Sequence, residues 1–356
     1  MSHRSQRRFV TYGTIAVALV VPFVFSAWHG REASRVVWSF QTEQPFFSAP
    51  AIDAERIYFV SADQQLHGLD WQSREVLWTL GLPETPRATP VYDESSGDLF
   101  LSTRSGVLMC IDALQGTVRW QLHIPGLRFR GGPTVSGDTL YLGCQNRWLY
   151  AIAVDDGSLR WKRFMEGPIL RPVAVDAERV YVTTYKGHLI AIDRVKAEEV
   201  WRFVVPDSVM SWPQVDGDLV LFGSHDKHLY AVDAATGEER WRHRTWHEVT
   251  TRPAVMGNRV VFGSWDHHLI CVDRDTGRLR WRHFMRDVIE SSPLIAGGTV
   301  YAGSWAGAVD AVDLETGHLR WTQQTGTWVT APPVLAPDGR TVLAASEDGT
   351  LYAFAP

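Results

Sequence analysis

The sequence has few cysteines and no large excess of charge of one sign. Its 356 residues include only 3 cysteines, Cys110, Cys144 and Cys271, which are too few and too widely spaced for a disulfide framework. We expect them to be small buried side chains. The formal net charge is −5, and no basic stripe with interleaved aromatic side chains is present. The composition therefore gives no support for a disulfide-stabilised scaffold or for nucleic-acid binding.

A helical apolar period is also missing after residue 34. Instead, short runs of β-branched and aromatic residues are separated by Gly, Asp and Pro, as in residues 219–224 and 229–232. Four such runs fit into each stretch of about 40 residues, which is typical of a β-propeller blade. The pattern therefore predicts an all-β fold.

Tryptophan marks the repeat. Eight of the 16 tryptophans recur at intervals of about 40 residues, and such a period indicates a repeat architecture. An aspartate precedes most of them by 8 residues, a glycine slot lies between the two, and a proline follows 11 to 13 residues later. Because every repeat carries them, we expect the indoles to pack between blades and the aspartates to bond turn amides. The eight are Trp38, Trp78, Trp120, Trp161, Trp201, Trp241, Trp281 and Trp321.

The number of landmarks predicts how the ring closes. Eight prolines open eight innermost strands, which we call A, followed outward by B, C and D. The last repeat ends without a D strand, whereas residues 35–40 at the other end form a D strand with no blade of its own. We therefore predict an eight-bladed β-propeller of four-stranded antiparallel blades over residues 35–356, closed by the N-terminal strand completing the C-terminal blade.

The repeat motif resembles a known family. The runs that carry it are Tyr230-Ala231-Val232-Asp233, Thr236-Gly237 and Trp241, repeated at Ile270-Cys271-Val272-Asp273, Thr276-Gly277 and Trp281. They are similar to the PQQ-like β-propeller repeat, and among eight-bladed members of this size the chain most resembles the BamB family of outer-membrane protein assembly. This resemblance implies a non-catalytic scaffold that binds other proteins. Its D–A loops, here residues 169–172 and 287–293, are implied to meet the partner barrel protein.

Catalysis is not favoured by the residues. Quinoprotein dehydrogenases with this repeat are implied to need a vicinal cysteine pair, a Glu/Asn calcium site and long insertions, none of which this sequence has. No Ser-His-Asp or nucleophile-elbow pattern stands out. His188, His228 and His268 occupy equivalent repeat positions, so their rings should diverge rather than share a metal. We predict no enzyme activity, no cofactor and no metal site.

The N-terminus predicts a location. A basic region at residues 1–8 precedes an uncharged stretch at 9–28, long enough to span a hydrocarbon core of about 30 Å. We predict a single-pass transmembrane signal-anchor helix in the inner membrane, a linker at 29–34 and a periplasmic propeller. A cleaved signal peptide is the alternative. BamB-type proteins are implied to carry a lipobox cysteine, and no cysteine precedes Cys110 here.

One face of the predicted propeller is variable in sequence. The D–A loops and the B–C turns should share this face, while the C–D face repeats Asp-x-x-Thr-Gly. Aromatic and arginine side chains, which dominate interface hot spots, concentrate on the variable face in successive blades. Local packing over the rim and a small-ligand pocket are the alternatives for these side chains. The predicted partner-binding residues are Arg171, Tyr185, Trp212, His225, Arg252, Trp265, Glu290 and Trp305.

Together these features predict a membrane-anchored periplasmic scaffold with a BamB-like role in envelope assembly. Its partner would be a membrane protein or protein complex rather than a small molecule. An extrinsic subunit of an inner-membrane respiratory or photosynthetic complex is a second hypothesis, favoured by the missing lipobox. A PQQ-binding enzyme or sensor is a third.

Overall fold

The computed structural model describes residues 34–85, 88–124 and 128–356. Within them, residues from Arg35 to Pro356 form one compact unit of strands and turns. The predicted basic region, signal-anchor helix and almost all of the linker, at 1–8, 9–28 and 29–34, lie outside the described residues. No helix long and apolar enough to cross a membrane occurs in the described part of the chain.

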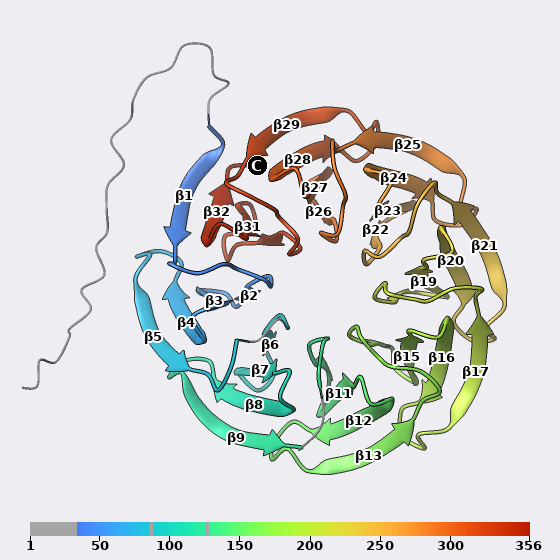
Figure 1. Ribbon diagram of the computed structural model, residues 1–356, viewed down its shortest axis with the longest axis horizontal. Helices are drawn as coiled ribbons and strands as arrows, with labels where there is room; N and C mark the ends of the chain where they lie inside the picture. Colours follow the sequence, from blue (N-terminus) through green and yellow to red (C-terminus); the bar gives the residue numbers. More distant parts are fainter. Residues whose placement is uncertain (1–33, 86–87, 125–127) are drawn as a thin grey trace, which may run out of the picture. The chain divides into compact units, whose positions relative to one another are not determined.

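The described strands form eight four-stranded antiparallel sheets, arranged around a central axis as blades (Figure 1). Within seven of the sheets the strands follow chain order from the axis outward, as the repeat predicted, and in the eighth the outermost strand is β1. The first four blades contain β2 (Ala51–Ile52), β3 (Arg56–Ser61), β4 (Gln65–Asp70) and β5 (Val76–Gly81); β6 (Val91–Asp93), β7 (Asp98–Ser102), β8 (Val107–Asp112) and β9 (Thr117–His123); β10 (Thr134–Ser136), β11 (Thr139–Gly143), β12 (Trp148–Ala153) and β13 (Leu159–Phe164); and β14 (Ala174–Val175), β15 (Arg179–Thr184), β16 (His188–Asp193) and β17 (Glu199–Val204).

The other four blades continue around the ring, and the last takes one strand from each end of the described chain. They contain β18 (Gln214–Asp216), β19 (Leu219–Gly223), β20 (His228–Asp233) and β21 (Glu239–Arg244); β22 (Ala254–Met256), β23 (Arg259–Gly263), β24 (His268–Asp273) and β25 (Leu279–Phe284); β26 (Leu294–Ala296), β27 (Thr299–Gly303), β28 (Ala308–Asp313) and β29 (Leu319–Gln324); and β30 (Val334–Leu335), β31 (Val342–Ser346), β32 (Thr350–Phe354) and β1 (Val36–Gln41).

The predicted closure is confirmed. Strand β1 pairs antiparallel with β32, with Phe40 opposite Leu351 and Gln41 opposite Thr350. Figure 1 shows the blue β1 lying outside the red β32, where the other blades have their D strand. Joining the two ends in one sheet covers an edge of β32 that would otherwise expose unpaired backbone groups.

Burial explains the repeating pattern of strands. The B and C strands are almost entirely buried, as in β19, because neighbouring blades cover both of their faces. The D strands alternate between exposed and half-buried residues, as in β13, because only their inner face meets a neighbour. Each pair of adjacent blades therefore encloses its own apolar core, as Trp241 does with Val260 and Phe262.

The periodic tryptophans join neighbouring blades, as predicted. Trp241 is buried, and its indole N–H donates to the backbone oxygen of Arg274 in the next blade at 2.7 Å. In the six bonds of this kind among the described residues, the oxygen belongs to the residue that follows the next blade's strand-C aspartate slot. This bond satisfies the one polar atom of a large apolar side chain. The same bond joins Trp78 to Ala113, Trp120 to Val154, Trp161 to Arg194, Trp201 to Ala234 and Trp281 to Leu314.

The glycine of each C–D turn is placed against the tryptophan of the preceding blade. Gly237 has a φ of +77°, and a Cβ built on it would lie 2.6 Å from the ring of Trp201. Arg74 and Ala197, which replace glycine in two repeats, keep a positive φ of 66° and 60°. The turn conformation is thus common to these repeats, and glycine adds close approach to the indole.

We expect Gly237→Ala to destabilise the protein more than Gly257→Ala. Both residues have positive φ, but nothing lies within 4 Å of a Cβ at Gly257. The shared backbone strain costs about 1–2 kcal/mol. The clash with Trp201 should add about 1–3 kcal/mol for Gly237→Ala. Equal losses of unfolding free energy in urea titrations of the two variants would show that the indole moves freely and contradict this packing.

The repeated aspartates bond turn amides, as predicted. The Asp233 carboxylate accepts the backbone N–H groups of Ala235 at 2.9 Å and Thr236 at 2.8 Å. It also pairs with Arg240, and this pairing with the turn bonds lowers its pKa to about 2. The three cysteines are buried and free, as expected, and burial raises the pKa of the Cys110 and Cys271 thiols to about 12.

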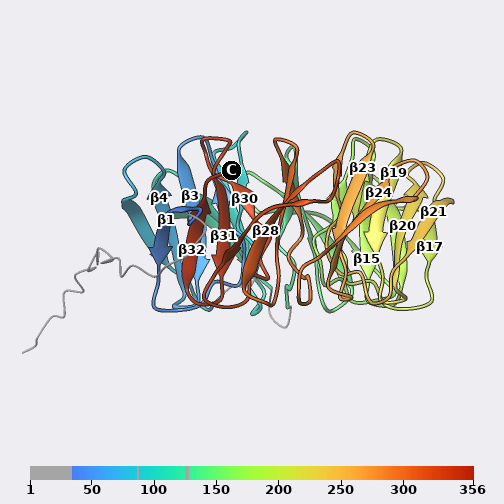
Figure 2. The ribbon, with the colours of Figure 1, turned by 90° about the horizontal axis from the view of Figure 1, so that it is seen from above.

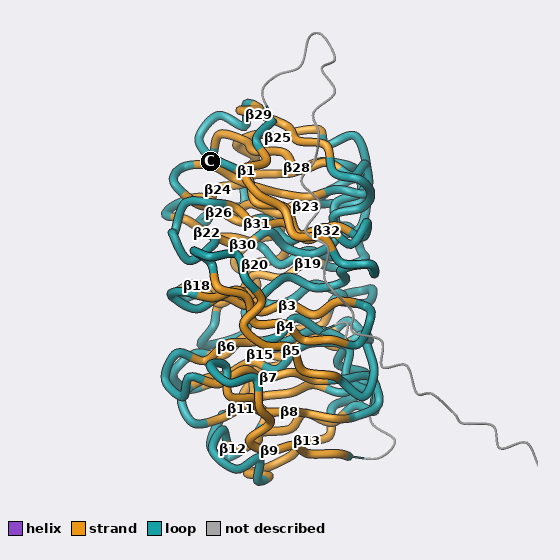
Figure 3. Tube along the Cα trace, turned by 90° about the vertical axis from the view of Figure 1, so that its left-hand side faces the viewer, coloured by secondary structure: helices purple, strands orange, loops and turns teal. Residues whose placement is uncertain are grey.

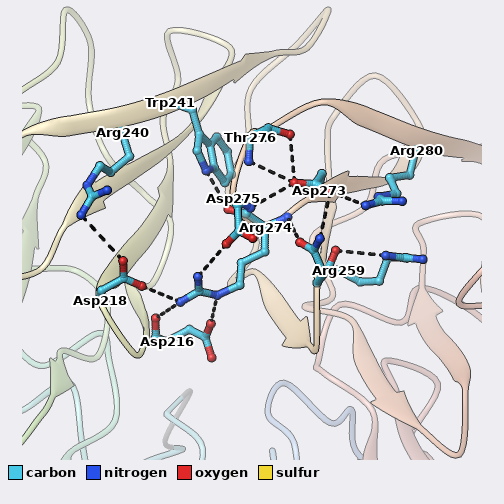
Figure 4. A network of polar contacts seen from close by, with 11 residues as sticks. Asp216, Asp218, Arg240, Trp241, Arg259, Asp273, Arg274, Asp275, Thr276 and Arg280 are labelled. Carbon is cyan, nitrogen blue, oxygen red and sulfur yellow. Dashed lines mark hydrogen bonds and ion pairs between the residues drawn. The ribbon is translucent and has the colours of Figure 1, made fainter.

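Arginines reinforce the C–D face between particular blades. Arg274 bonds Asp216 and Asp218 of the preceding blade and Asp275 of its own turn (Figure 4). These carboxylates raise the pKa of Arg274 above its ordinary value. Arg194 fills the same repeat position and donates to the backbone oxygen of Ser136 in the preceding blade at 3.1 Å. The C–D face is therefore engaged in holding neighbouring blades together.

One carboxylate is buried between two blades and is contacted by two nitrogen-bearing side chains. Asp310 on β28 is 1% exposed, and its two oxygens lie 3.0 Å from His283 Nε2 and 3.1 Å from Arg286 Nη2. In the other blades this position of strand C holds no acid. The residues there are His67, Met109, Tyr150, Ile190, Tyr230, Ile270 and Tyr352.

Candidate interaction face and channel mouth

The D–A loops and the B–C turns lie on one face, and backbone hydrogen bonds hold them together. The N–H of Tyr185 donates to the oxygen of Pro168 at 2.9 Å, and that of Trp265 donates to Glu248 at 3.0 Å. We call this side of the propeller the D–A face. Figures 2 and 3 show that loops gather on two opposite sides of the strands. The same bond joins Ala62 to Pro45, Gln145 to Arg128, His225 to Ser208, Trp305 to Val288 and Glu347 to Trp328.

Three predicted residues form part of a row of rings on the D–A face. We call His225, Trp265, Trp305 and Trp328 the aromatic arc. Trp305 stacks on Trp328 with ring centroids 5.0 Å apart, and it meets Trp265 at 6.2 Å. Trp265 in turn lies 6.4 Å from His225. The arc runs from the fifth blade, β18 to β21, to the loop that enters the last blade, so equivalent turn positions bring residues 40 apart into contact.

The aromatic arc is partly exposed, and two of its ring nitrogens lack a hydrogen-bond partner among the described residues. Trp265 donates its indole N–H to Thr250 Oγ1 at 3.0 Å, which fixes its ring. Trp305 Nε1 and His225 Nε2 are buried without a hydrogen-bond partner among the described residues. Trp328 is 46% exposed and is the most accessible ring of the arc. A large exposed aromatic ring is typical of a contact surface.

Four other predicted residues lie in the central channel instead of on the rim. Arg171, Trp212, Arg252 and Glu290 line a cavity of about 450 Å³ together with the residues around the A strands. The eighth, Tyr185, is 49% exposed and makes no ring contact with the arc among the described residues. The structure therefore divides the predicted set between two places.

The channel arginines are fixed by single hydrogen bonds. Arg171 Nε donates to the backbone oxygen of Met210 at 2.7 Å, and Arg252 Nε donates to Gln214 Oε1 at 2.7 Å. Burial lowers the pKa of Arg171. The negative charge of Glu290 opposes this shift, and the positive charge of Arg130 adds to it. Burial also lowers the pKa of Arg252, because protein surrounds the channel in which it lies. Part of the Arg252 side chain still reaches solvent. Neither guanidinium makes an ion pair with a described residue.

The channel opens on the D–A face through a second cavity of about 350 Å³, which we call the channel mouth. Sequence reasoning had not selected three of its charged residues, Arg104, Arg130 and Glu347. Arg104 and Glu347 occupy the same repeat position as Trp265, directly after strand B, so the position itself could have found them. Trp328 and the 66% exposed Trp246 were also missed, because D–A loops vary between repeats.

No cluster of three or more His, Cys, Asp or Glu side chains that could hold a metal ion occurs among residues 34–85, 88–124 and 128–356. His228 and His268 each place Nδ1 near a backbone oxygen of their own turn, at 2.9 Å from Asp226 and 2.7 Å from Asp266. Each of these two rings therefore contacts its own turn, and the two turns belong to separate blades.

Comparison with known proteins identifies relatives of the fold and of the sequence. A family model described as "Outer membrane protein assembly factor BamB" matches residues 27–126, 73–172, 103–244 and 225–356. The outer membrane protein assembly factor BamB of Yersinia pestis is 24% identical over 162 residues, which are 41% of this chain and 40% of that protein. The chain thus matches less than half the length of this relative.

Solved structures show the same architecture. BamB from Moraxella catarrhalis superposes with a TM-score of 0.80 at 18% identity, over 91% of this chain and 100% of that chain. Quinohemoprotein alcohol dehydrogenase from Comamonas testosteroni superposes with a TM-score of 0.74 at 13% identity, over 90% of this chain and 76% of that chain. At these identities the likeness concerns the fold alone.

Proposed function

The chain belongs to the family of the outer membrane protein assembly factor BamB, and we propose that it is a non-catalytic scaffold that binds a protein partner of the cell envelope through its D–A face. The observation that carries this proposal is the aromatic arc. Four turns and loops place their rings in a row, Trp305 stacks on Trp328, and Trp328 is exposed. On the opposite face, Arg274 is engaged in bonds between blades.

The relatives' name supports the kind of partner. An outer membrane protein assembly factor acts together with other proteins, so a protein of the outer-membrane assembly pathway is the partner that we propose. In this proposal the propeller lies in the periplasm, held at the inner membrane by residues 9–28. The proposal includes no catalysis, although quinohemoprotein alcohol dehydrogenase has the same fold, because a shared fold does not transfer chemistry.

The test is recovery of partners from membranes extracted with mild detergent. We expect the double substitution Trp305→Ser and Trp328→Ser to reduce recovery about tenfold or more, because aromatic anchors dominate the binding energy of interfaces. Leu114→Ser is the matched control, since Leu114 is an exposed apolar residue of a C–D turn on the other face, 61% accessible. The co-purified proteins are identified by mass spectrometry.

The melting temperature separates binding from packing. Unchanged recovery by the tryptophan double variant would end the proposal for this face. A large fall in melting temperature would show instead that Trp305 and Trp328 belong to the core. Trp328→Ser alone then decides the matter, because this ring is the more exposed of the two.

A further inference from the structure

The channel mouth has separated charges. Its three cations, Arg104, Arg130 and Arg171, come from the second, third and fourth blades or the loops that enter them. Its two acids, Glu290 and Glu347, come from the seventh and the eighth. Blades four apart in an eight-bladed ring lie opposite each other, as β11 and β27 do in Figure 1. The cationic and anionic walls of the mouth therefore face each other across it.

Close ion pairs with residues 34–85, 88–124 and 128–356 do not neutralise these charges. Among the described residues, none of the five makes an ion pair, and Glu347 accepts only the Thr330 hydroxyl at 2.9 Å. Arg171 uses Nε for the Met210 oxygen, which leaves its two terminal nitrogens for other acceptors. Charges of opposite sign on facing walls of a cavity, without an ion-pair partner among the described residues, form a site for a ligand that carries both charges.

We propose that the channel mouth binds a small zwitterion, with a carboxylate against Arg104, Arg130 and Arg171 and an ammonium group against Glu290 and Glu347. The chemical class is that of a short peptide with free ends. A cavity of about 350 Å³ lies at the lower end of the range for small-molecule sites. Phe47, Leu170 and Met210 supply apolar wall between the charged groups. This site does not depend on the protein partner proposed above. The sequence predicted only a protein partner, and the channel mouth adds a small-molecule ligand.

Three probes that differ only in their ends test the proposal by calorimetric titration of the purified full-length protein. Triglycine carries both charges, N-acetyltriglycine keeps only the carboxylate, and triglycinamide keeps only the ammonium group. We expect triglycine to bind about tenfold more tightly than either of the others, because each end loses its charge-assisted hydrogen bonds when it is blocked.

Two variants assign each end to its wall. Arg130→Gln should remove most of the preference for triglycine over triglycinamide, and Glu290→Gln should remove most of the preference over N-acetyltriglycine. Neither side chain makes a hydrogen bond with a described residue, so folding should be preserved. Arg244→Gln and Glu238→Gln are the matched controls, since both residues are exposed, Arg244 on the outer strand β21 and Glu238 directly before it, after the C–D turn.

The outcomes are distinct. No measurable binding of triglycine, or equal affinity for the three probes, would overturn the proposal. Retention of both preferences in Arg130→Gln and Glu290→Gln would also overturn it, because the ligand would then lie elsewhere. All of these readouts use purified protein, so they are independent of partner recovery from membranes.

Discussion

Replacing Trp241 with alanine should lower the free energy of unfolding by about 3–5 kcal/mol, the cost of truncating a large buried aromatic side chain. The indole is 8% exposed and packs among Leu229, Val260 and Phe262 of its own and the next blade. Alanine would leave a cavity at the junction of two blades, and the Arg274 oxygen would lose its donor. Denaturation in guanidinium chloride, followed by tryptophan fluorescence, measures the loss.

Trp246→Ala is the matched control for that variant, only five residues away. Trp246 is 66% exposed, and its contacts are the ring of His268 and the guanidinium of Arg282. Its loss should cost at most about 1 kcal/mol, as for an exposed cation–π contact. Similar losses for Trp241→Ala and Trp246→Ala would mean that the periodic tryptophans do not hold the blades together.

Asp310→Ala should cost about 1–3 kcal/mol, because the largely buried His283 ring would lose its hydrogen-bond partner. Arg286 adds little to this loss, since its side chain is 48% exposed and water can solvate its charge. His283 and Arg286 both direct nitrogen atoms at this carboxylate. The control is Asp275→Asn, which removes an exposed pair with Arg274 and should change stability by less than about 1 kcal/mol.

A double variant tests whether charge or shape is responsible. The repeat already uses Ile190 and Ile270 at the position of Asp310, and Leu80 and Leu122 at that of His283. We expect His283→Leu with Asp310→Ile to lie within about 1 kcal/mol of the native protein, since apolar replacement of a buried pair is often neutral. A double variant less stable than Asp310→Ala would contradict a purely electrostatic origin of the loss.

The fold could be derived from the sequence because its determinants are local and repeated. Each blade uses the same turn and the same indole, and most use the same aspartate, so one unit such as Asp233, Gly237 and Trp241 explains most of the others. The missing D strand after Phe354 and the unpaired strand around Trp38 then leave one way to close the ring. The substitution of Gly by Arg74 and Ala197 did not disturb this, since both keep the positive φ of the turn.

The candidate site could be predicted only in part. The sequence located the variable face, because strand order alone places the D–A loops and B–C turns on one face and the A–B and C–D turns on the other. It could not separate Trp265, on the rim, from Arg171 and Glu290, in the channel, because that depends on how far each loop reaches toward the axis. Nor could it select Trp328, because the equivalent loop positions hold no other aromatic residue, as Val288 and Glu248 show.

By itself, the sequence determined eight blades, their strand order and the strand that closes them, because these follow from spacings along the chain that burial enforces in each repeat. Only the tertiary structure decided which side chains meet. Closing the ring brings the charged walls of Arg130 and Glu290 to face each other and stacks Trp305 on Trp328. Contacts of this kind depend on the curvature of the whole ring, which no single repeat contains.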